Sequence, residues 1–410
     1  MTAPVRLLSV ATLGLLLLGC RGRSPNAAAK DGGLPALVAE LSPRVEEAVG
    51  LRFSSVPISA VVSREAVRSY LAQQLERELP KRRRDGLVGA YRLLGLLPDS
   101  LDLEALILKL YSEQVAGYYD FDTKTLYGVE GADETQLRLV MAHELVHALQ
   151  GQHLPLDTIM NDTSIDNDRK TARQAVLEGQ ATLASIMVLT PGRALLEDAA
   201  FWELYREQIA EAQDKLPAFK SAPAVLKSGL IFPYLNGAEF MRWWLQTRGR
   251  DSMPFGAAMP QSTEQILAPD RLARGDAPVR LRLDPLPALG DELLQDALGE
   301  LELRILSDEV RGTQLINRPV PIGWGGDRYR VWQTPNGPAL ELVIVWDDAR
   351  GAERFAPVLR AVADAQPAGR RAVLQSEIRD GRPLDRLLIG PEGWAGFASA
   401  AAVSVEPPAN

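Results

Sequence analysis

Cysteine and histidine are scarce in this chain. Its 410 residues include a single cysteine, Cys20, so no internal disulfide can form and burial of apolar side chains must stabilise the fold. Only three histidines occur, and all of them lie between residues 143 and 153. Any site that uses imidazole groups must therefore be built around this short segment.

An excess of positive charge is also absent. The formal net charge is −8, which argues against nucleic acid as a partner. The basic run at residues 81–84 is too short to reverse this argument, and we expect it to be a solvated loop. With 46% hydrophobic and 24% charged residues, the composition is that of an ordinary globular protein, and the length allows two or three domains.

The N-terminus has the pattern of an export signal. Arg6 supplies a positive charge, residues 7–18 are apolar, and Leu17-Leu-Gly-Cys20 ends the run. This resembles the bacterial lipoprotein signal, whose cysteine is acylated and becomes the first mature residue. The resemblance implies a lipid anchor at Cys20 in the bacterial cell envelope, at the outer membrane or the periplasmic face. An uncleaved anchor and an ordinary secretory signal stay open as alternatives, although the apolar run is short for a membrane span.

Two of the histidines lie on a predicted helix. Asp133 is a good N-cap for it, and Gly151 suits the left-handed residue that ends a helix. His143 and His147 stand four residues apart, so both rings point from one face. Glu144 follows His143 directly and can reach a water molecule held by a metal on the two histidines. This arrangement predicts a zinc site, against the alternative of two histidines packed in a helix core.

A catalytic zinc site needs a third protein ligand and leaves a fourth position for water. We expect it from a second helix, predicted over residues 171–189, which carries Glu178. The small Gly179 beside it would let this helix approach the first one closely. His153 is the rival ligand, because its spacing fits the motif H-E-x-x-H-x-x-G-x-x-H. That motif requires glycine at position 150, which is Gln150 here, so we prefer Glu178.

These motifs resemble the gluzincin clan of zinc metallopeptidases, which includes thermolysin and aminopeptidases. More narrowly, the chain resembles an uncharacterised family of bacterial metallopeptidases that are often lipoproteins. The resemblance covers roughly residues 111–272, and its motifs read here as residues 113–120, 143–150, 176–181, 232–237 and 262–267. It implies a zinc-dependent peptidase acting on a peptide or protein substrate. The chain departs from the family at Ala268, where histidine is usual, and the family has no settled substrate.

With zinc held by the predicted ligands, Glu144 would act as general base and then as general acid toward the leaving amine. The oxyanion of the tetrahedral intermediate needs a second donor besides the metal. Because no histidine follows position 153, we assign Tyr234 to this role, with Arg328 and Tyr119 as weaker candidates.

Two further features would support such a site. Aromatic-rich, β-prone runs within residues 117–129 predict a hairpin, whose edge strand would bind extended substrate by strand addition or simply complete a small sheet. Asp166 or Asp168 could orient a ligating histidine through its other ring nitrogen.

The predicted fold class is α+β and mainly helical. It combines a gluzincin-like metallopeptidase core, which includes the hairpin, with a smaller C-terminal α+β unit. We expect helices at 35–50, 63–79, 101–115, 198–216 and after 237, in addition to the two of the site. In the C-terminal unit we expect strands at 299–305, 329–333, 340–346, 371–378 and 386–388, and a helix at 351–363.

The chain is accordingly divided into six parts. These are a signal peptide (1–20), a tether (21–34), an N-terminal helical support (35–115), the zinc metallopeptidase core (116–268), a linker (269–295) and the C-terminal unit (296–400).

The predicted function is a lipid-anchored zinc endopeptidase or other peptide hydrolase. The alternative is a non-catalytic envelope lipoprotein that keeps the zinc helix pair as a scaffold and binds partners through its C-terminal unit. The presence of Glu144 favours the enzyme, because a scaffold has no chemical use for that carboxylate.

Overall fold

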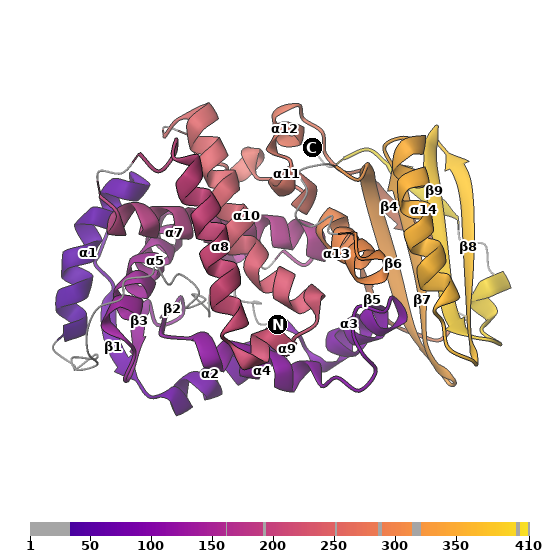
Figure 1. The fold of residues 1–410 in the computed structure, drawn as a ribbon, viewed down its shortest axis with the longest axis horizontal. Coiled ribbons are helices and arrows are strands. Elements are labelled where there is room, and N and C mark those ends of the chain that lie inside the picture. The colour runs from indigo at the N-terminus through magenta and orange to yellow at the C-terminus, as the bar shows by residue number, and fades with distance from the viewer. Residues whose placement is uncertain are drawn as a thin grey trace.

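The computed structural model describes residues 33–160, 162–191, 194–250, 252–285, 289–313, 321–398 and 402–408. The predicted signal peptide, Cys20 and nearly all of the predicted tether lie outside these residues. In the part that is described, no helix combines the length and the apolar character of a membrane span. The fold class is α+β and mainly helical, as predicted, with a helical N-terminal region and a C-terminal antiparallel sheet (Figure 1).

Two long helices, α5 (Glu134–His153) and α7 (Asn167–Leu189), pack against each other at the centre of the helical region. Helix α10 (Ala224–Arg248) also packs against α7, and α1 (Gly33–Val49) covers both α5 and α7. The remaining helices of this region are α2 (Arg64–Glu78), α3 (Lys81–Leu93), α4 (Leu103–Gln114), α6 (Leu156–Met160), α8 (Ala199–Asp214), α9 (Pro217–Ser221), α11 (Thr263–Leu267) and α12 (Pro269–Ala273).

A three-stranded sheet lies beside α5. Its strands are β1 (Ile58–Val62), β2 (Gly117–Asp120) and β3 (Thr125–Val129), in the order β1-β3-β2. Strands β2 and β3 form the predicted antiparallel hairpin, and β1 pairs with β3 in parallel. Strand β2 is therefore an edge strand of this sheet within the described chain, and α5 packs against it.

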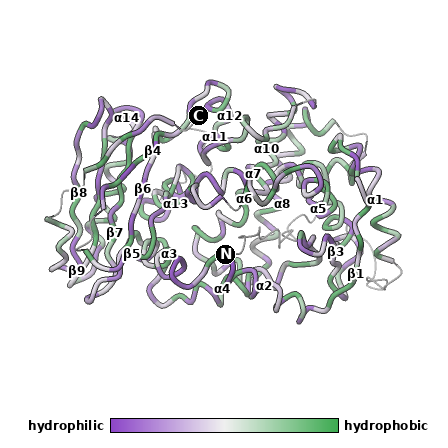
Figure 2. Tube along the Cα trace, turned by 180° about the vertical axis from the view of Figure 1, so that it is seen from behind, coloured by the Kyte–Doolittle hydropathy of each residue, from purple (hydrophilic) through white to green (hydrophobic). Residues whose placement is uncertain are grey.

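The C-terminal unit is built on a five-stranded antiparallel sheet in the order β5-β6-β7-β9-β8. Helices α13 and α14 cover one face, and the two-stranded ribbon β4–β10 packs on the other. Helix α14 contains both hydrophobic and hydrophilic residues (Figure 2). Its buried residues recur at helical spacing, so they lie on one face of the helix. The elements are β4 (Arg280–Leu283), β5 (Asp291–Asp296), α13 (Gly299–Arg311), β6 (Trp324–Thr334), β7 (Gly337–Trp346), α14 (Ala349–Asp364), β8 (Arg370–Arg379), β9 (Arg382–Pro391) and β10 (Val403–Glu406).

Most predicted helices and strands lie where we expected them, but several predictions are wrong. Gly151 does not end α5, which continues to His153; its missing side chain instead leaves room for the ring of Phe121, 3.2 Å from an ideal Cβ. Residues 299–305 form the first turns of α13 rather than a strand. The buried Glu300 pairs with Arg304 one helical turn later, as helical spacing allows.

The basic run at residues 81–84 is the first turn of α3, not a loop. Two of its arginines form ion pairs with β5, Arg82 with Asp291 at 2.7 Å and Arg83 with Asp296 at 3.0 Å. The run therefore joins the helical region to the C-terminal sheet.

The predicted linker, residues 269–295, also contains regular structure. It includes α12, β4 and most of β5. Its Pro and Arg residues suggested a connector, but β4 gains its partner only through pairing with β10, far along the chain. The domain boundaries themselves stay predictions.

Candidate metal centre

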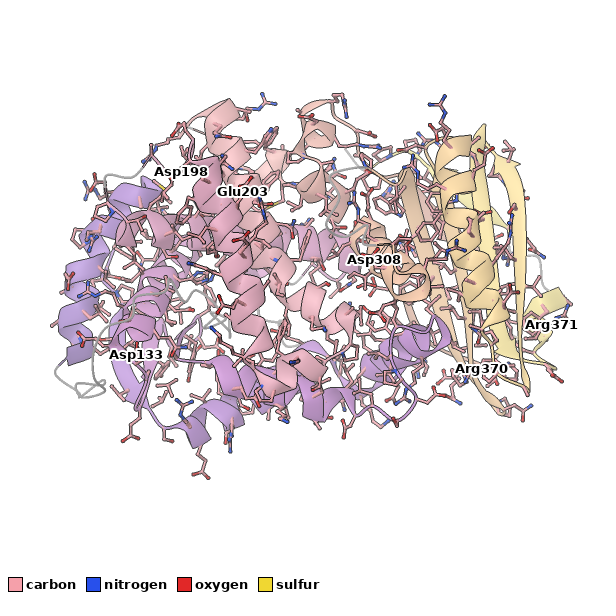
Figure 3. The ribbon with its side chains drawn as sticks, viewed as in Figure 1. Asp133, Asp198, Glu203, Asp308, Arg370 and Arg371 are labelled. Carbon is pink, nitrogen blue, oxygen red and sulfur yellow. The ribbon has the colours of Figure 1, made fainter. Side chains whose placement is uncertain are left out.

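Helix α5 carries the two histidines into the interior. Asp133, which is labelled in Figure 3, is its N-cap, as predicted. It accepts hydrogen bonds from the backbone N–H groups of Thr135 and Gln136 at 2.9 and 3.1 Å. From residue 139 to residue 150 every side chain is buried, because the sheet, α1 and α7 surround this helix. The rings of His143 and His147 lie one turn apart, with centroids separated by 4.8 Å.

Glu178 of α7 meets both rings. Its Oε2 atom lies 3.0 Å from Nε2 of His143 and 3.2 Å from Nε2 of His147, and the two Nε2 atoms are 3.1 Å apart. All three side chains are at most 2% exposed. Among the residues that the structure describes, this is the one group of His, Cys, Asp and Glu side chains able to hold a metal ion.

The geometry of this group fits zinc. Zinc bonds of about 2.0–2.1 Å in a tetrahedron place neighbouring ligand atoms roughly 3.3 Å apart, close to the three separations found here. Two histidines and one glutamate are also the ligand set of a class of catalytic zinc sites. The two Nε2 atoms and Oε2 of Glu178 all carry lone pairs and face one another in the protein interior. Such atoms repel one another unless a proton or a metal ion lies among them.

The charges of the group are strongly coupled. Burial lowers the pKa of His147, but the charge and hydrogen bond of Glu178 act more strongly and raise that pKa to about 9. Burial also raises the pKa of Glu178, whereas the two histidines together lower it to about 2. Glu178 is therefore a carboxylate at neutral pH, ready to hold a cation. A metal ion and a proton compete for the same atoms.

Gln150 sets the tautomer of His147. Its Nε2 donates to the backbone carbonyl of Leu177 at 3.0 Å and to the side chain of Gln180 at 2.9 Å. Its Oε1 is thereby left to accept from Nδ1 of His147 at 2.8 Å. With the proton on Nδ1, the lone pair of Nε2 points toward Glu178, as metal binding requires. We had not identified this residue, although it follows His147 by three positions on the same helix.

Glu144 lies against the edge of β2. Its Oε2 accepts a hydrogen bond from the backbone N–H of Tyr119 at 2.9 Å. In the β2–β3 ladder Ala116 bonds to Val129, so the backbone groups of Gly117 and Tyr119 point away from β3. The side of this strand that does not pair with β3 therefore faces Glu144.

Tyr234, which we assigned from the sequence as the oxyanion donor, lies next to the group. Its ring centroid is 5.9 Å from that of His143, and it extends from α10. Burial, followed by the charge of Glu178, raises the pKa of Tyr234 well above its usual value. Its hydroxyl is consequently protonated at neutral pH and able to donate a hydrogen bond.

Helix α10 is held close to α7 by two glycines. An ideal Cβ on Gly179 would lie 2.7 Å from Cα of Gly237, with the carbonyl group of Gly237 closer still. We had expected Gly179 to allow close packing of α7 against α5, but it allows close packing against α10 instead. Residues 232–237, expected before a helix, are part of α10, which contains Pro233.

Four other candidates lie away from the group. His153 is exposed and contacts the carbonyl of Arg52 at 2.7 Å. Asp166 is the N-cap of α7, about 18 Å along that helix from Glu178, and Arg328 pairs with it at 3.8 Å. Asp168 accepts hydrogen bonds from the backbone and hydroxyl of Thr263, at 3.1 Å and 2.5 Å, so neither aspartate orients a histidine.

One family model matches the chain, described as a domain of unknown function (DUF8575), over residues 288–402. The match spans most of the C-terminal sheet unit and excludes α5, α7 and α10. No curated protein and no solved structure matches. The geometry of His143, His147 and Glu178 supports a metal site of the type His-Glu-x-x-His followed by Glu.

Proposed function

We propose that the protein is a zinc-dependent peptidase. The observation that carries this proposal is the meeting of His143, His147 and Glu178 at 3.0–3.2 Å, with Glu144 directly beside His143 in the chain. We assign the first three as zinc ligands and Glu144 as the general base.

When bound, zinc polarises a carbonyl oxygen and lowers the pKa of water to about 7. Glu144 then takes the proton of the attacking water and passes it to the leaving amine. The hydroxyl of Tyr234 donates a hydrogen bond to the oxyanion that forms on the carbonyl carbon. Gln150 keeps the ring of His147 oriented throughout.

The edge of β2 is where we place the substrate backbone. The outward carbonyl groups of Gly117 and Tyr119 can pair with an extended peptide, as in strand addition. This edge leads to Glu144, whose carboxylate is bonded to Tyr119. A peptide on β2 would thus place one of its amide bonds near the general base.

The proposed location follows from the N-terminal sequence. Lipidation of Cys20 would anchor the enzyme in the bacterial cell envelope, at the outer membrane or the periplasmic face, with peptides or proteins as substrates. Labelling with a radioactive fatty acid, compared between the natural protein and Cys20→Ala, tests this anchor.

Glu144→Gln tests the enzyme. The variant keeps the shape of the side chain but cannot accept a proton, so we expect it to bind zinc as the natural protein does and to lose about 10²- to 10⁴-fold in kcat for peptide hydrolysis. Glu134→Gln, an exposed position in the first turn of α5, is the matched control and should retain activity. A zinc-loaded natural protein that cleaves no peptide would favour the scaffold alternative.

A further inference from the structure

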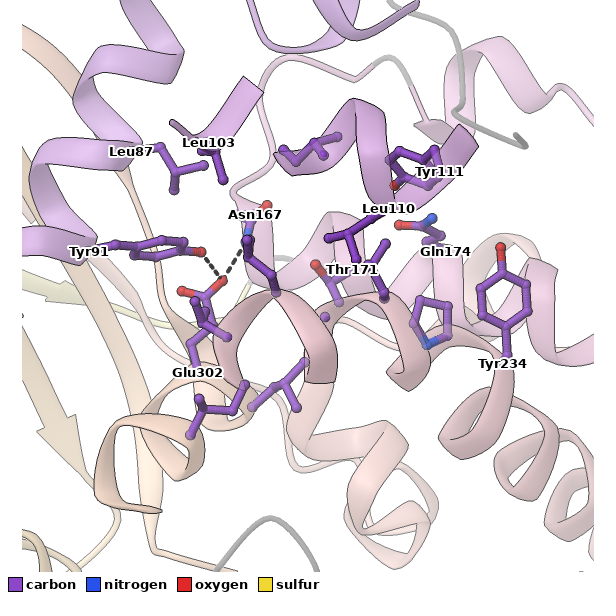
Figure 4. Close-up of a pocket in the computed structure, with 18 residues that line it drawn as sticks. Leu87, Tyr91, Leu103, Leu110, Tyr111, Asn167, Thr171, Gln174, Tyr234 and Glu302 are labelled. Atoms are coloured by element: carbon purple, nitrogen blue, oxygen red, sulfur yellow. Dashed lines mark hydrogen bonds between the residues drawn. The ribbon is translucent and has the colours of Figure 1, made fainter. Parts of the chain in front are cut away.

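A cavity of about 230 Å³ lies beside the candidate metal centre. Its walls come from α3, α4, α7, α10 and α13, and most of the residues that line it are Leu, Ile, Val or Pro (Figure 4). None of these residues belongs to the ligand set or is the general base.

Tyr234 connects this cavity to the metal centre. It lines the cavity, and its ring is also 5.9 Å from the ring of His143. Gln174, one helical turn before Glu178 on α7, lines the same end, together with Tyr111 (Figure 4). A group bound in the cavity would therefore lie directly beside the reacting atoms.

The opposite end is closed by the C-terminal unit. Glu302 of α13 accepts hydrogen bonds on one oxygen from the hydroxyl of Tyr91 at 2.7 Å and from the amide of Asn167 at 3.0 Å (Figure 4). Burial raises the pKa of Glu302 to about 8, so this carboxyl group is largely neutral at pH 7. Leu301 and Ile305 of the same helix add apolar wall.

The size and lining of the cavity indicate its occupant. A cavity of about 150 Å³ lined by aliphatic side chains binds benzene, so this larger one accommodates a phenylalanine or leucine side chain. The residues of α7 that line the cavity run from Asn167 to Gln174, which is about 10 Å along that helix. A wall that is mainly aliphatic favours an apolar side chain over a cationic one.

We infer that this cavity receives a large apolar side chain of the substrate, such as Leu, Phe or Met, next to the cleaved bond. The C-terminal unit, which has no assigned role, then contributes to substrate recognition through α13. The inference rests on the proposed peptidase activity and adds the side chain that the enzyme selects.

Gly229 of α10 is an exposed position from which a large side chain can block the cavity. It lines the cavity, and an ideal Cβ on it would meet no atom within 4 Å. Gly229→Phe should therefore fold, because replacing glycine inside a helix also favours the helix. Gly393→Phe is the matched control, at an exposed turn with equally open space.

The test compares peptides that differ at one position next to the cleaved bond, on each side in turn. We expect kcat/KM for Leu or Phe to exceed that for Ala by at least about tenfold in the natural protein and in Gly393→Phe. Gly229→Phe should lose this preference while still cleaving the Ala peptide. Equal cleavage of all peptides, a preference for Lys or Arg, or an unchanged preference in Gly229→Phe would overturn the inference.

A binding experiment separates this inference from the proposed function. N-acetyl-phenylalaninamide should bind to the zinc-loaded Glu144→Gln protein, as measured by calorimetry, and should bind at least about tenfold more weakly when Gly229→Phe is added. Binding of this kind without hydrolysis in the natural protein would uphold the pocket and contradict the peptidase. Absence of binding with hydrolysis intact would contradict the pocket alone.

Discussion

The close contact between α7 and α10 allows us to predict how far a substitution at Gly179 would displace the two helices. Gly179 and Gly237 bring the two helix backbones together, and a Cβ on Gly179 would lie 2.7 Å from Cα of Gly237. The carbonyl carbon of Gly237 would be closer still, at 2.2 Å, whereas ordinary contact begins near 3.4 Å, so Gly179→Ala would move the helices apart by about 1 Å. Because Glu178 precedes Gly179 and Tyr234 lies one turn before Gly237, both would move relative to the histidines.

We expect two measurable effects of Gly179→Ala. Forcing a methyl group into a packed contact costs about 1–3 kcal/mol of unfolding free energy. A displacement approaching 1 Å at the site should also weaken zinc binding and reduce peptide hydrolysis, by roughly tenfold or more. Urea unfolding in the presence of a chelator measures the first effect without the stabilisation that bound metal adds. A zinc titration measures the second.

Gly229→Ala is the matched control for Gly179→Ala. It changes glycine to alanine in α10 where no atom is within 4 Å, so it should stabilise the protein by up to about 1 kcal/mol and leave zinc binding unchanged. If Gly179→Ala unfolded at the same urea concentration as the natural protein and bound zinc equally well, the claim that this contact positions Glu178 would be refuted.

Two other predictions concern polar groups. Gln150→Leu should weaken zinc binding by about 10- to 100-fold in a titration, because His147 loses the acceptor that fixes its tautomer; Gln152→Leu in the same helix should not, and equal effects would contradict the role of Gln150. Burial, followed by the charge of Glu300, raises the pKa of Glu264 from its usual 4.5 to about 10. Between pH 4.5 and about pH 10 the folded protein therefore binds more protons than the unfolded chain, so the free energy of unfolding falls as the pH rises. Glu264→Gln should thus raise the urea midpoint more at pH 9 than at pH 5, and equal shifts would contradict this reasoning.

The candidate ligands could be predicted because their pattern is local. Two histidines four residues apart on one helix must share a face, whatever the rest of the chain does. Glu178 needed the additional motif around it, since a glutamate on a helix usually faces solvent. The tertiary structure brings this carboxylate to both rings, as the motif implied.

Other features depend on partners that are distant in sequence. Asp168 bonds to Thr263, 95 residues later, and Arg83 pairs with Asp296, 213 residues later. No periodicity reveals such partners, so the aspartates and the basic run were assigned wrongly. The first turns of α13 were predicted as a strand for a related reason. Charged residues usually mark the exposed face of a helix, but residues 299–307 are all buried, so the charged residues among them mark no such face.

Metal analysis of three purified proteins tests the central claim most directly. We predict that the natural protein and His153→Ala each hold a single zinc ion per chain, and that Glu178→Ala loses most of it. Zinc retained in Glu178→Ala but lost from His153→Ala would contradict the ligand set of His143, His147 and Glu178.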